Sequence, residues 1–411
     1  MKTDNNIQTF EQCLKCNICA DVCPMMAVNP AYPGPKQSGP DGERYRLKSP
    51  VFVDKALKYC LNCKRCEVAC PSDVPVGDII QAARLASAPK VPKIRDWALA
   101  STDFVGSVAS SMSPLVNKVL GLGFTRKTMD ALFSIDCHRI FPKYAGERFE
   151  KWFEREAAPA QEQFGRKVNY FHGCYANYNY PKLAQDLVKI LNAAGCGVRL
   201  LKDEKCCGVA LISNGLKEKA TAQARTNIDA MRAVEGPVLT TSSTCTMTMR
   251  DEYPHLLDVD NADVRDRIML ATRFLHQEVE QGRMKLAFRP EYKRRVAYHT
   301  ACHMSRLGWQ YFSVSMLRMI PGVELVELEQ NCCGIAGTFG FKEENYGFSQ
   351  MIGEKLFATI RDAAPDLVAT DCETCKWQIE MSTGFKVENP ISILADALDV
   401  VQTQKLNNAI K

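Results

Sequence analysis

The sequence predicts an α+β protein of several domains, with a helical N-terminal domain at 1–90, a helical connector at 91–165 and two repeated α/β domains at 166–290 and 291–411. Two observations predict this organisation. One four-cysteine motif occurs twice within the first 70 residues, and from Lys167 onward the chain repeats itself at a period near 128 residues. A chain of 411 residues is long enough for each part to bury its own core.

Composition limits what these domains can do. The net charge of +5 and the 24% of charged residues are ordinary for a soluble protein, so a nucleic-acid-binding tail or a disordered chain is not indicated. The 19 cysteines are the unusual count. Because residues 1–16 lack the apolar segment of a secretory signal, we expect a chain in the reducing cytoplasm, where closely spaced cysteines serve metals or redox chemistry.

The N-terminal domain contains the motif C-x2-C-x2-C-x3-C-P twice, ending at Pro24 and at Pro71. This spacing is typical of bacterial ferredoxins with two [4Fe-4S] clusters, in which the fourth cysteine of each motif binds the other cluster. Zinc is the alternative, but zinc ribbons separate two C-x2-C units by a longer gap. The predicted ligand sets are Cys13, Cys16, Cys19 and Cys70 for one cluster and Cys23, Cys60, Cys63 and Cys66 for the other.

The segment between the two motifs favours a helical ferredoxin domain. It is rich in proline and glycine up to residue 42, and 53–59 and 76–85 then have helical patterns. A compact β-ribbon ferredoxin needs no segment of this length. The domain resembles the helical ferredoxin module of fumarate and heterodisulfide reductase iron–sulfur subunits.

The connector contains an amphipathic stretch that we expect to form two short helices meeting at Pro114. Its apolar stripe consists of Phe104, Val108, Met112, Leu115 and Val119, and basic flanks are provided by Lys90, Lys93, Arg95, Arg126 and Lys127. The stripe can lie on a membrane surface or pack against the other domains. Polar residues interrupt it too often for a membrane span, which needs about 18 apolar residues.

Each C-terminal repeat is predicted to form a parallel sheet with a cysteine site at its edge. The first repeat alternates strands at 167–170, 197–201 and 237–241 with helices at 182–193 and 221–233. The second has strands at 294–298, 323–328 and 366–370 and helices at 310–319 and 349–363. Cysteines follow the strands, and the carboxyl ends of parallel strands form ligand sites. We therefore expect one cysteine cluster in each repeat.

The two cysteine sets differ at one position. The second repeat contains Cys302, Cys332, Cys333, Cys372 and Cys375, whereas the first contains only Cys174, Cys206, Cys207 and Cys245, with Ser242 at the position of Cys372. Cys137 and Cys196 remain and are interpreted as structural. His172, His299 and His303 flank the sets, either as hydrogen-bonded packing residues or as proton donors.

These repeats resemble the cysteine-rich CCG domain pair of heterodisulfide reductase subunits and of the iron–sulfur subunits of glycolate, lactate and glycerol-3-phosphate oxidising complexes. The resemblance implies that a complete five-cysteine set holds a further, non-cubane [4Fe-4S] cluster. It makes a third cluster in the second repeat an expectation, and leaves the incomplete set of the first repeat a doubtful site.

The sequence contains no P-loop and no dinucleotide fingerprint, so electrons must come from a partner. Segments such as 29–37, 241–246 and 370–383, and the chain from about Phe10 to Ala397, are similar to the iron–sulfur subunits of anaerobic glycerol-3-phosphate dehydrogenases. This resemblance implies a non-catalytic electron-transfer subunit at the cytoplasmic face of the bacterial inner membrane. Its partners would be flavoprotein subunits A and B and the quinone pool, with no nucleic acid.

Two alternative functions remain at this stage. The chain can be the iron–sulfur subunit of a glycolate or lactate oxidase, which is also an electron carrier. It can instead be an enzyme that reduces a disulfide, as heterodisulfide reductases do. The incomplete first repeat disfavours the enzyme, because the catalytic member of that family uses two complete cysteine sets.

Overall fold

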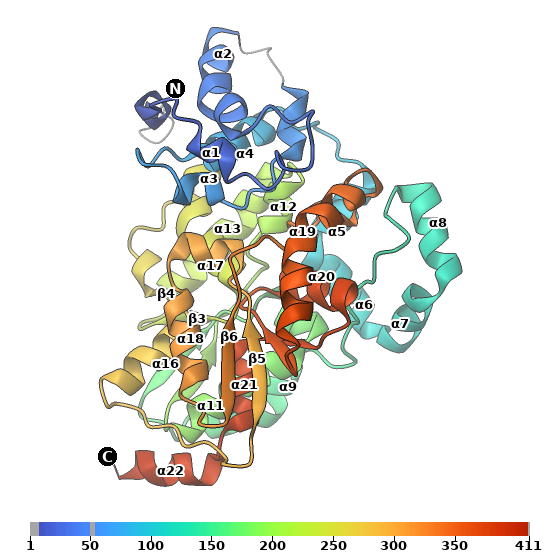
Figure 1. Ribbon diagram of the computed structural model, residues 1–411. Helices are drawn as coiled ribbons and strands as arrows, with labels where there is room; N and C mark the ends of the chain where they lie inside the picture. The colour runs from blue at the N-terminus through green and yellow to red at the C-terminus, as the bar shows by residue number, and fades with distance from the viewer. Residues whose placement is uncertain (1–7, 50–53, 410–411) are drawn as a thin grey trace.

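Two four-stranded parallel sheets form the body of the molecule, and the N-terminal helical domain lies at one end of both (Figure 1). The computed structural model describes residues 8–49 and 54–409. The predicted α+β class with two α/β repeats is confirmed, because both sheets have the same topology, β2-β1-β3-β4 and β6-β5-β7-β8.

The N-terminal domain consists of short helices joined by long turns. Its elements are η1 (Gln8–Gln12), α1 (Ile18–Asp21), η2 (Gln37–Asp41), α2 (Gly42–Lys48), η3 (Lys55–Tyr59), α3 (Arg65–Val68) and α4 (Val76–Ala86). The predicted helix at 76–85 is confirmed as α4. Of the predicted helix at 53–59, residue 53 lies outside the described residues, Asp54 is an N-cap, and 55–59 is the 3-10 helix η3.

The connector forms seven helices where the sequence predicted two. They are α5 (Ile94–Ala100), α6 (Thr102–Ser111), α7 (Ser113–Gly121), α8 (Gly123–Phe133), α9 (Phe149–Trp152), η4 (Phe153–Ala157) and α10 (Ala158–Gln161). The predicted pair meeting at Pro114 corresponds to α6 and α7. Pro114 lies in the first turn of α7, where backbone N–H groups have no partner within the helix, so its missing N–H breaks no hydrogen bond. In Figure 1, α7 and α8 project sideways from the body.

The first repeat begins with β1 (Lys167–Tyr170), η5 (Tyr175–Asn179), α11 (Pro181–Ala193), β2 (Gly197–Leu200), α12 (Val209–Ser213) and α13 (Lys217–Arg232). It continues with β3 (Val238–Thr240), α14 (Ser243–Met247), η6 (Thr248–Glu252), α15 (Tyr253–Leu257), η7 (Arg265–Arg267), β4 (Ile268–Leu270) and α16 (Ala271–Glu280). Leu183, Leu187 and Leu191 recur at helical spacing along α11 and are buried, which is why this amphipathic segment covers the sheet.

The second repeat follows the same order. It contains β5 (Arg294–Tyr298), α17 (Cys302–Leu307), α18 (Gln310–Arg318), β6 (Val323–Glu327), η8 (Phe339–Phe341), α19 (Glu343–Ala363), β7 (Leu367–Ala369), α20 (Glu373–Thr383), β8 (Val387–Glu388), α21 (Pro390–Ala397) and α22 (Val400–Asn408). The helices α13 and α19 begin four and six residues earlier than predicted. The fourth strand of each sheet was not predicted, because β4 and β8 have only three and two residues.

One hydrophobic core joins the two repeats. Val168 and Tyr170 of β1, Val296 and Tyr298 of β5, and Ile393 of α21 belong to the same buried cluster. The helices α11 and α21 contact each other within it. The two sheets are therefore held in a fixed relation, and the cysteines that follow β3 and β7 can contact residues of the opposite repeat.

Candidate iron–sulfur sites

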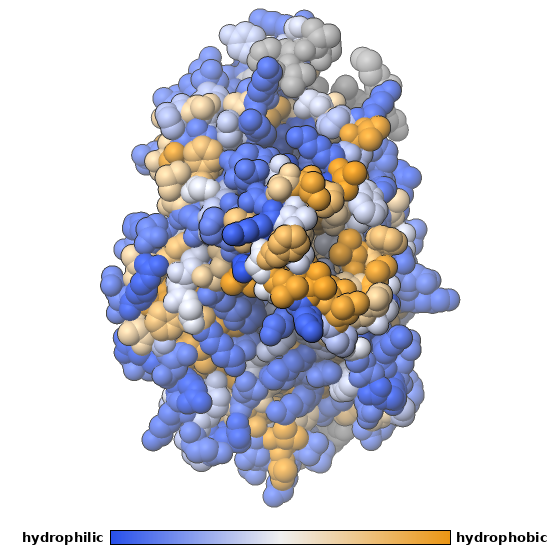
Figure 2. Space-filling view, turned by 90° about the vertical axis from the view of Figure 1, so that its right-hand side faces the viewer, coloured by the Kyte–Doolittle hydropathy of each residue, from blue (hydrophilic) through white to orange (hydrophobic). Residues whose placement is uncertain are grey.

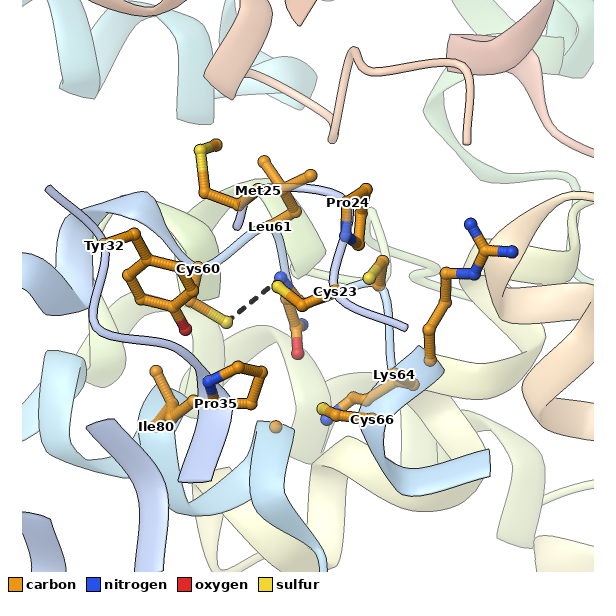
Figure 3. Close-up of a pocket in the computed structure, with 14 residues that line it drawn as sticks. Cys23, Pro24, Met25, Tyr32, Pro35, Cys60, Leu61, Lys64, Cys66 and Ile80 are labelled. Atoms are coloured by element: carbon orange, nitrogen blue, oxygen red, sulfur yellow. Dashed lines mark hydrogen bonds between the residues drawn. The ribbon is translucent and has the colours of Figure 1, made fainter. Parts of the chain in front are cut away.

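The first thiol set surrounds a pocket whose lining residues all belong to the N-terminal domain. Cys23 from the first motif lines it together with Cys60, Cys63 and Cys66 from the second. Figure 3 shows the sulfur atoms of Cys23 and Cys60 directed toward each other across this cavity, with Tyr32 and Leu61 beside them. The set that the motif spacing predicted for the second cluster is therefore brought together in space.

The second thiol set surrounds a separate pocket of the N-terminal domain. Cys13, Cys16 and Cys19 line it together with Cys70 from the other motif. Cys16 is exposed, so this cavity lies near the protein surface, whereas Cys66 of the first cavity is buried. Each motif contributes its fourth cysteine to the other cavity, as the two-cluster ferredoxin pattern requires.

Left-handed residues shape both cysteine loops. Lys15 and Asn17 have φ values of 58° and 68°, and the corresponding Asn62 and Lys64 have values of 54° and 59°. A non-glycine residue in this region is uncommon and costs free energy, so four of them at matching positions indicate a required loop shape. These turns direct three closely spaced thiols toward one point.

Backbone and side-chain N–H groups point at the sulfur atoms. Asn62 N and Gln81 Nε2 each lie 3.5 Å from Cys60 Sγ, and Val74 N lies 3.4 Å from Cys70 Sγ. Burial raises the pKa of the Cys23 thiol to about 12. Since metals bind thiolates, loading this site releases protons, and the N–H groups then stabilise the negative sulfur.

The five cysteines of the second repeat form one connected set of hydrogen-bonded thiols. Cys302 contacts Cys332, Cys332 contacts Cys333, Cys333 Sγ lies 3.3 Å from Cys375 Sγ, and Cys375 contacts Cys372. An iron–sulfur cluster is bound by cysteine thiolates, typically four, and this set of five connected thiols can provide them.

His299 supports the same fit. It is fully buried, and neither of its ring nitrogens has a hydrogen-bond partner among the described residues. Its pKa is lowered to about 4, chiefly by burial. A buried imidazole without hydrogen-bond partners is energetically costly. The unpaired ring of His299 near Cys332 is therefore consistent with a cluster bound at the second-repeat thiols. By contrast, His172 bonds the Gly173 carbonyl, and His303 lies 3.0 Å from the Asn62 carbonyl, so both are hydrogen-bonded packing residues.

The first repeat brings together its four thiols, with a hydroxyl at the fifth position. Cys206 Sγ lies 3.7 Å from Cys174 Sγ and also contacts Cys207, which contacts Cys245. The Ser242 hydroxyl accepts from Cys245 N at 3.2 Å, as an N-cap of α14, and donates to Glu373 Oε1 at 3.2 Å. Ser242 is therefore engaged with the second repeat, and a hydroxyl is a poorer ligand for iron than a thiolate.

One thiol contact joins the N-terminal domain to the second repeat, and polar contacts join further parts of the chain to the thiol sets. Cys63 of the N-terminal domain is hydrogen-bonded to Cys302 of the second repeat. Thr244 Oγ1 of the first repeat lies 3.7 Å from Cys372 Sγ. Asp103 of α6 accepts from Cys206 N at 2.8 Å. The ferredoxin thiols therefore meet the thiols of the second repeat directly, whereas the second-repeat set meets the first repeat through the Thr244 hydroxyl.

A buried ionic network joins the N-terminal domain to both repeats. The Lys64 ammonium contacts Asp78, lies 3.5 Å from Glu67 and lies 3.8 Å from Glu252, which is fully buried. Arg306 of α17 contacts Glu67 at 3.1 Å. Burial alone would lower the pKa of Lys64, but the three carboxylates raise it above its ordinary value, so the lysine stays charged.

His255 of α15 makes this domain contact dependent on pH. Its Nδ1 lies 2.9 Å from Asp78 Oδ2, and this hydrogen bond raises the pKa of His255. A raised pKa contributes stability below the ordinary value near 6.5, and that stability is lost as the pH rises through the higher folded value. We expect the melting temperature to fall more between pH 6 and pH 9 in the native chain than in His255→Gln.

The control for this prediction is His138→Gln, whose side chain is 69% exposed and lies far along the chain from the domain contact. It should keep the native pH dependence of the melting temperature. An identical pH dependence in native protein and in His255→Gln would contradict the prediction.

Several site residues could not be found from the sequence. Lys64, Asp103 and Glu373 are ordinary charged residues in their local context, and charged side chains are usually exposed. Their position in the sequence is the one signal that could have indicated them. Lys64 and Glu373 directly follow predicted cysteine ligands, and Asp103 lies in the first turn of a helix that contacts Cys206. Thr370 is a further example, and its hydroxyl has no hydrogen-bond partner in the described part of the chain.

The connector stripe is exposed rather than packed as core. Phe104, Val108, Met112 and Leu115 are between 52% and 61% exposed, and Phe124 of α8 is 82% exposed. Figure 2 shows hydrophobic side chains gathered near the middle of the face where α6, α7 and α8 lie. Among the described residues, no helix combines the length and the apolar character of a membrane span.

One predicted flanking residue is not accessible to a membrane. Arg95 is only 6% exposed and pairs with Glu344 at 2.7 Å, so its interpretation as a lipid-contacting residue is wrong. Of the other predicted flanking residues, Lys90, Lys93 and Lys127 are exposed and Arg126 is partly buried. Nothing near Arg95 in the sequence indicates the pair, because its partner lies 249 residues away.

Comparison with known proteins agrees with this arrangement. Residues 9–74 match the 4Fe-4S dicluster domain family, and residues 168–250 and 296–380 each match the cysteine-rich domain family. The chain is 52% identical over 397 residues to the C subunit of the anaerobic glycerol-3-phosphate dehydrogenase of Escherichia coli K12, covering 96% of this chain and 100% of the relative. It is 24% identical to a probable glycolate oxidase iron–sulfur subunit of Bacillus subtilis, covering 90% and 88%.

Proposed function

The chain belongs to the family of anaerobic glycerol-3-phosphate dehydrogenase C subunits, and on this basis we propose that it is the iron–sulfur electron-transfer subunit of such a dehydrogenase. Flavoprotein subunits A and B oxidise sn-glycerol 3-phosphate to dihydroxyacetone phosphate, and this chain passes the electrons to the membrane quinone pool. The observation that carries the proposal is the pair of four-thiol pockets in the N-terminal domain together with the thiol contact from Cys63 to Cys302 of the second repeat.

The proposed ligand sets are the two ferredoxin sets and the five cysteines of the second repeat. A bound [4Fe-4S] cluster supplies one-electron chemistry, which a chain without flavin needs in order to carry electrons. The protein holds the thiols in place and supplies N–H donors to the sulfur atoms. It also excludes water from the inner sites, since Cys66, Cys332, Cys333, Cys372 and Cys375 are all buried.

The contacts support one order of electron transfer. The exposed Cys16 set is the accessible entrance for a partner subunit. The Cys63 set follows because it is in contact with Cys302 of the second repeat. Direct thiol contact favours rapid transfer between neighbouring sets, so no external carrier is needed between the two domains.

A variant of the entrance tests this function. In the complex with its flavoprotein partners, Cys70→Ser should abolish quinone reduction driven by glycerol 3-phosphate, while a dye that accepts directly from the flavin is still reduced. Loss of the fourth ligand disrupts a cluster bound from both motifs. Quinone and dye reduction are measured in parallel assays, with Cys137→Ser as a control because Cys137 belongs to no thiol set.

Three outcomes would contradict the proposal. Unchanged quinone reduction in Cys70→Ser means that the ferredoxin domain is not the route. Loss of dye reduction as well means that this domain also supports the flavoprotein subunits. Electrons accepted from glycolate or lactate dehydrogenating partners, but not from glycerol 3-phosphate, would place the chain in the alternative oxidase complexes.

We further propose that α6, α7 and α8 attach the chain to the cytoplasmic face of the inner membrane. The exposed apolar stripe would enter the headgroup region, and the exposed Lys93, Lys118 and Lys127 would contact anionic lipids. Each basic residue near the surface contributes about 1 kcal/mol. This mode of attachment needs no membrane-spanning helix, and it brings the thiol series near a lipid-soluble acceptor.

Charged substitutions test the attachment. Val108→Glu, Met112→Glu and Val119→Glu together should lower binding to anionic vesicles by roughly tenfold or more. Each replaced apolar side chain no longer contributes about 1–2 kcal/mol of binding free energy by insertion into lipid. Sedimentation with vesicles measures binding, and a melting curve checks the fold. The matched control is Met351→Glu with Val401→Glu, whose side chains are 51% and 61% exposed elsewhere on the surface.

Because the three stripe residues are 40% to 52% exposed, their substitution should leave the melting temperature nearly unchanged. A large drop in melting temperature would show that the stripe packs against protein. Undiminished vesicle binding would show that the membrane contact lies elsewhere.

A further inference from the structure

One fully buried side chain beside the second-repeat thiols lacks a partner in the described part of the chain. His299 directly follows β5 and is 0% exposed, and neither Nδ1 nor Nε2 of its ring is hydrogen-bonded to any residue of 8–49 and 54–409. Burial lowers its pKa to about 4, so the imidazole is neutral, with one N–H donor and one acceptor nitrogen. An unpaired donor in a protein interior costs free energy. The ring therefore needs a partner that these residues do not supply.

The position of His299 on the sheet directs its side chain to the thiol side. Its backbone N–H donates to the Ala369 carbonyl at 2.9 Å, so the pairing of β5 with β7 continues to this residue. Side chains alternate between the two faces of a strand, which places His299 on the face of Ala297 and opposite Tyr298. Ala297 packs in the buried cluster that includes three of the second-repeat thiols, whereas Tyr298 packs in the core between the repeats.

Only one kind of acceptor is available to the ring N–H. The charged groups that act on the imidazole are Cys332 and Arg65 of α3. A guanidinium only donates hydrogen bonds, and Arg65 already donates to the Gln330 carbonyl. Sulfur atoms of an iron–sulfur cluster accept hydrogen bonds. The acceptor for His299 is therefore on the sulfur side.

The first repeat shows what this position contains where the thiol set is incomplete. Phe171 lies three residues before Cys174, as His299 lies three residues before Cys302. The Phe171 N–H also donates to the neighbouring strand at 2.9 Å, and its buried ring packs in the cluster that includes three of the first-repeat thiols. The fold thus accepts an apolar ring at this position. The polar ring occurs in the repeat that has five cysteines.

We propose that His299 donates an N–H hydrogen bond to a sulfur atom of the cluster held by the second-repeat thiols, and thereby raises the reduction potential of that cluster. Reduction adds one negative charge to the cluster, and an N–H donor stabilises the more negative form more strongly. No bond forms or breaks in His299, and the ring keeps its proton. The inference rests on the proposed function, because a higher potential makes the second repeat the better acceptor of electrons from the Cys63 set.

A redox titration of the full chain, purified without oxygen and followed by EPR, measures the potential. The signal that is absent from Cys333→Ser belongs to the second-repeat cluster. His299→Phe should lower the midpoint potential of this signal, because it removes the donor and keeps a ring that the first repeat accommodates at the same position. We expect the ratio of reduced to oxidised cluster at a given potential to fall about tenfold for one lost hydrogen bond, which is about 59 mV for one electron.

Two conservative variants separate the hydrogen bond from the packing of the ring. Asparagine places an amide N–H near the position of Nδ1, and glutamine places one near Nε2. One of His299→Asn and His299→Gln should therefore keep a potential nearer to the native value than the other does.

The matched control is Tyr170→Phe, on the corresponding strand of the first repeat. It removes a fully buried hydroxyl that lies 3.2 Å from Thr241 Oγ1. Tyr170→Phe should lower the melting temperature and leave the potential of the second-repeat cluster unchanged.

Pulsed EPR on protein labelled with ¹⁵N-histidine detects the contact itself. In its paramagnetic state the second-repeat cluster should show coupling to a ¹⁵N nucleus, and this coupling should be lost in His299→Phe. A ring that only fills space gives no such coupling. Since His303 is next to Cys302, the loss in His299→Phe is what assigns the nucleus to His299.

The outcomes separate this inference from the proposed function. A native potential and an unchanged ¹⁵N signal in His299→Phe, with native iron content, overturn the inference, mean that a buried water alone pairs the ring, and leave the proposed function standing. If His299→Phe loses iron, equal potentials in His299→Asn and His299→Gln overturn it. A native chain with only about 8 iron atoms overturns it together with the proposed second-repeat ligand set. If the ¹⁵N coupling is present but glycerol 3-phosphate does not reduce the cluster in the complex, the proposed function fails and the hydrogen bond stands.

Discussion

Protein purified without oxygen is expected to hold about 12 iron atoms per chain, and Cys333→Ser about 8, because two ferredoxin clusters account for about 8 and one four-iron cluster in the second repeat for the rest. Cys333 is 3% exposed, and its sulfur lies 3.3 Å from that of Cys375, at the centre of the five-thiol set. Its loss should therefore empty that site and no other. Iron and protein are quantified in the same samples.

The matched control for this prediction is Cys207→Ser, the corresponding position of the first repeat. Cys207 is also buried, at 2% exposed, but its set has Ser242 in place of a fifth thiol, and the Ser242 hydroxyl donates to Glu373. Cys207→Ser should leave the count near 12. A native count near 8 that Cys333→Ser does not change would exclude a cluster in the second repeat. A native count near 16 would mean that four thiols and a hydroxyl suffice in the first.

Replacement of Lys64 by methionine should be the most destabilising change outside the thiol sets. The variant keeps the volume of the side chain but removes the positive charge that faces Asp78, Glu67 and Glu252. Removing one partner of a buried ion pair costs about 3–5 kcal/mol, because the remaining charges stay buried without compensation. For domains of this size we expect the melting temperature to fall by roughly 10 °C.

Two further variants separate charge from packing. Lys55 is an exposed lysine of the same domain, so Lys55→Met should change the melting temperature little. Adding Glu252→Gln to Lys64→Met should restore part of the lost stability, since one uncompensated carboxylate is removed, and the double-mutant cycle measures the coupling between them. A melting temperature unchanged in Lys64→Met would mean that water reaches these carboxylates and screens them.

The network also explains how the N-terminal domain is held against the repeats. Asn62 Nδ2 donates to Glu252 Oε1 at 2.6 Å, and His303 bridges the Asn62 carbonyl and Thr244 Oγ1. These polar contacts surround the point where Cys63 meets Cys302. Since electron transfer depends steeply on distance, the same contacts that stabilise the interface also keep the thiol sets close.

The sequence by itself determined which residues form each ferredoxin set and how the repeats are built. The C-x2-C-x2-C-x3-C-P spacing restricts three thiols to one turn, so the local chain geometry already decides that Cys60, Cys63 and Cys66 converge. The alternation of strands and helices predicts parallel sheets, and cysteines that follow β3 and β7 must then lie at the carboxyl edge. The substitution at Ser242 was visible from the repeat alone.

Only the tertiary structure decided how these parts meet. Nothing local to Cys63 indicates that it contacts Cys302, 239 positions further along the chain, and nothing local to Lys64 distinguishes it from an exposed lysine. An amphipathic stripe such as that of α6 and α7 has the same pattern whether it faces a core or the solvent, so its exposure follows from the packing of the other helices. Spacing and periodicity report short-range geometry, whereas burial and contact between domains depend on which surfaces the whole chain leaves uncovered.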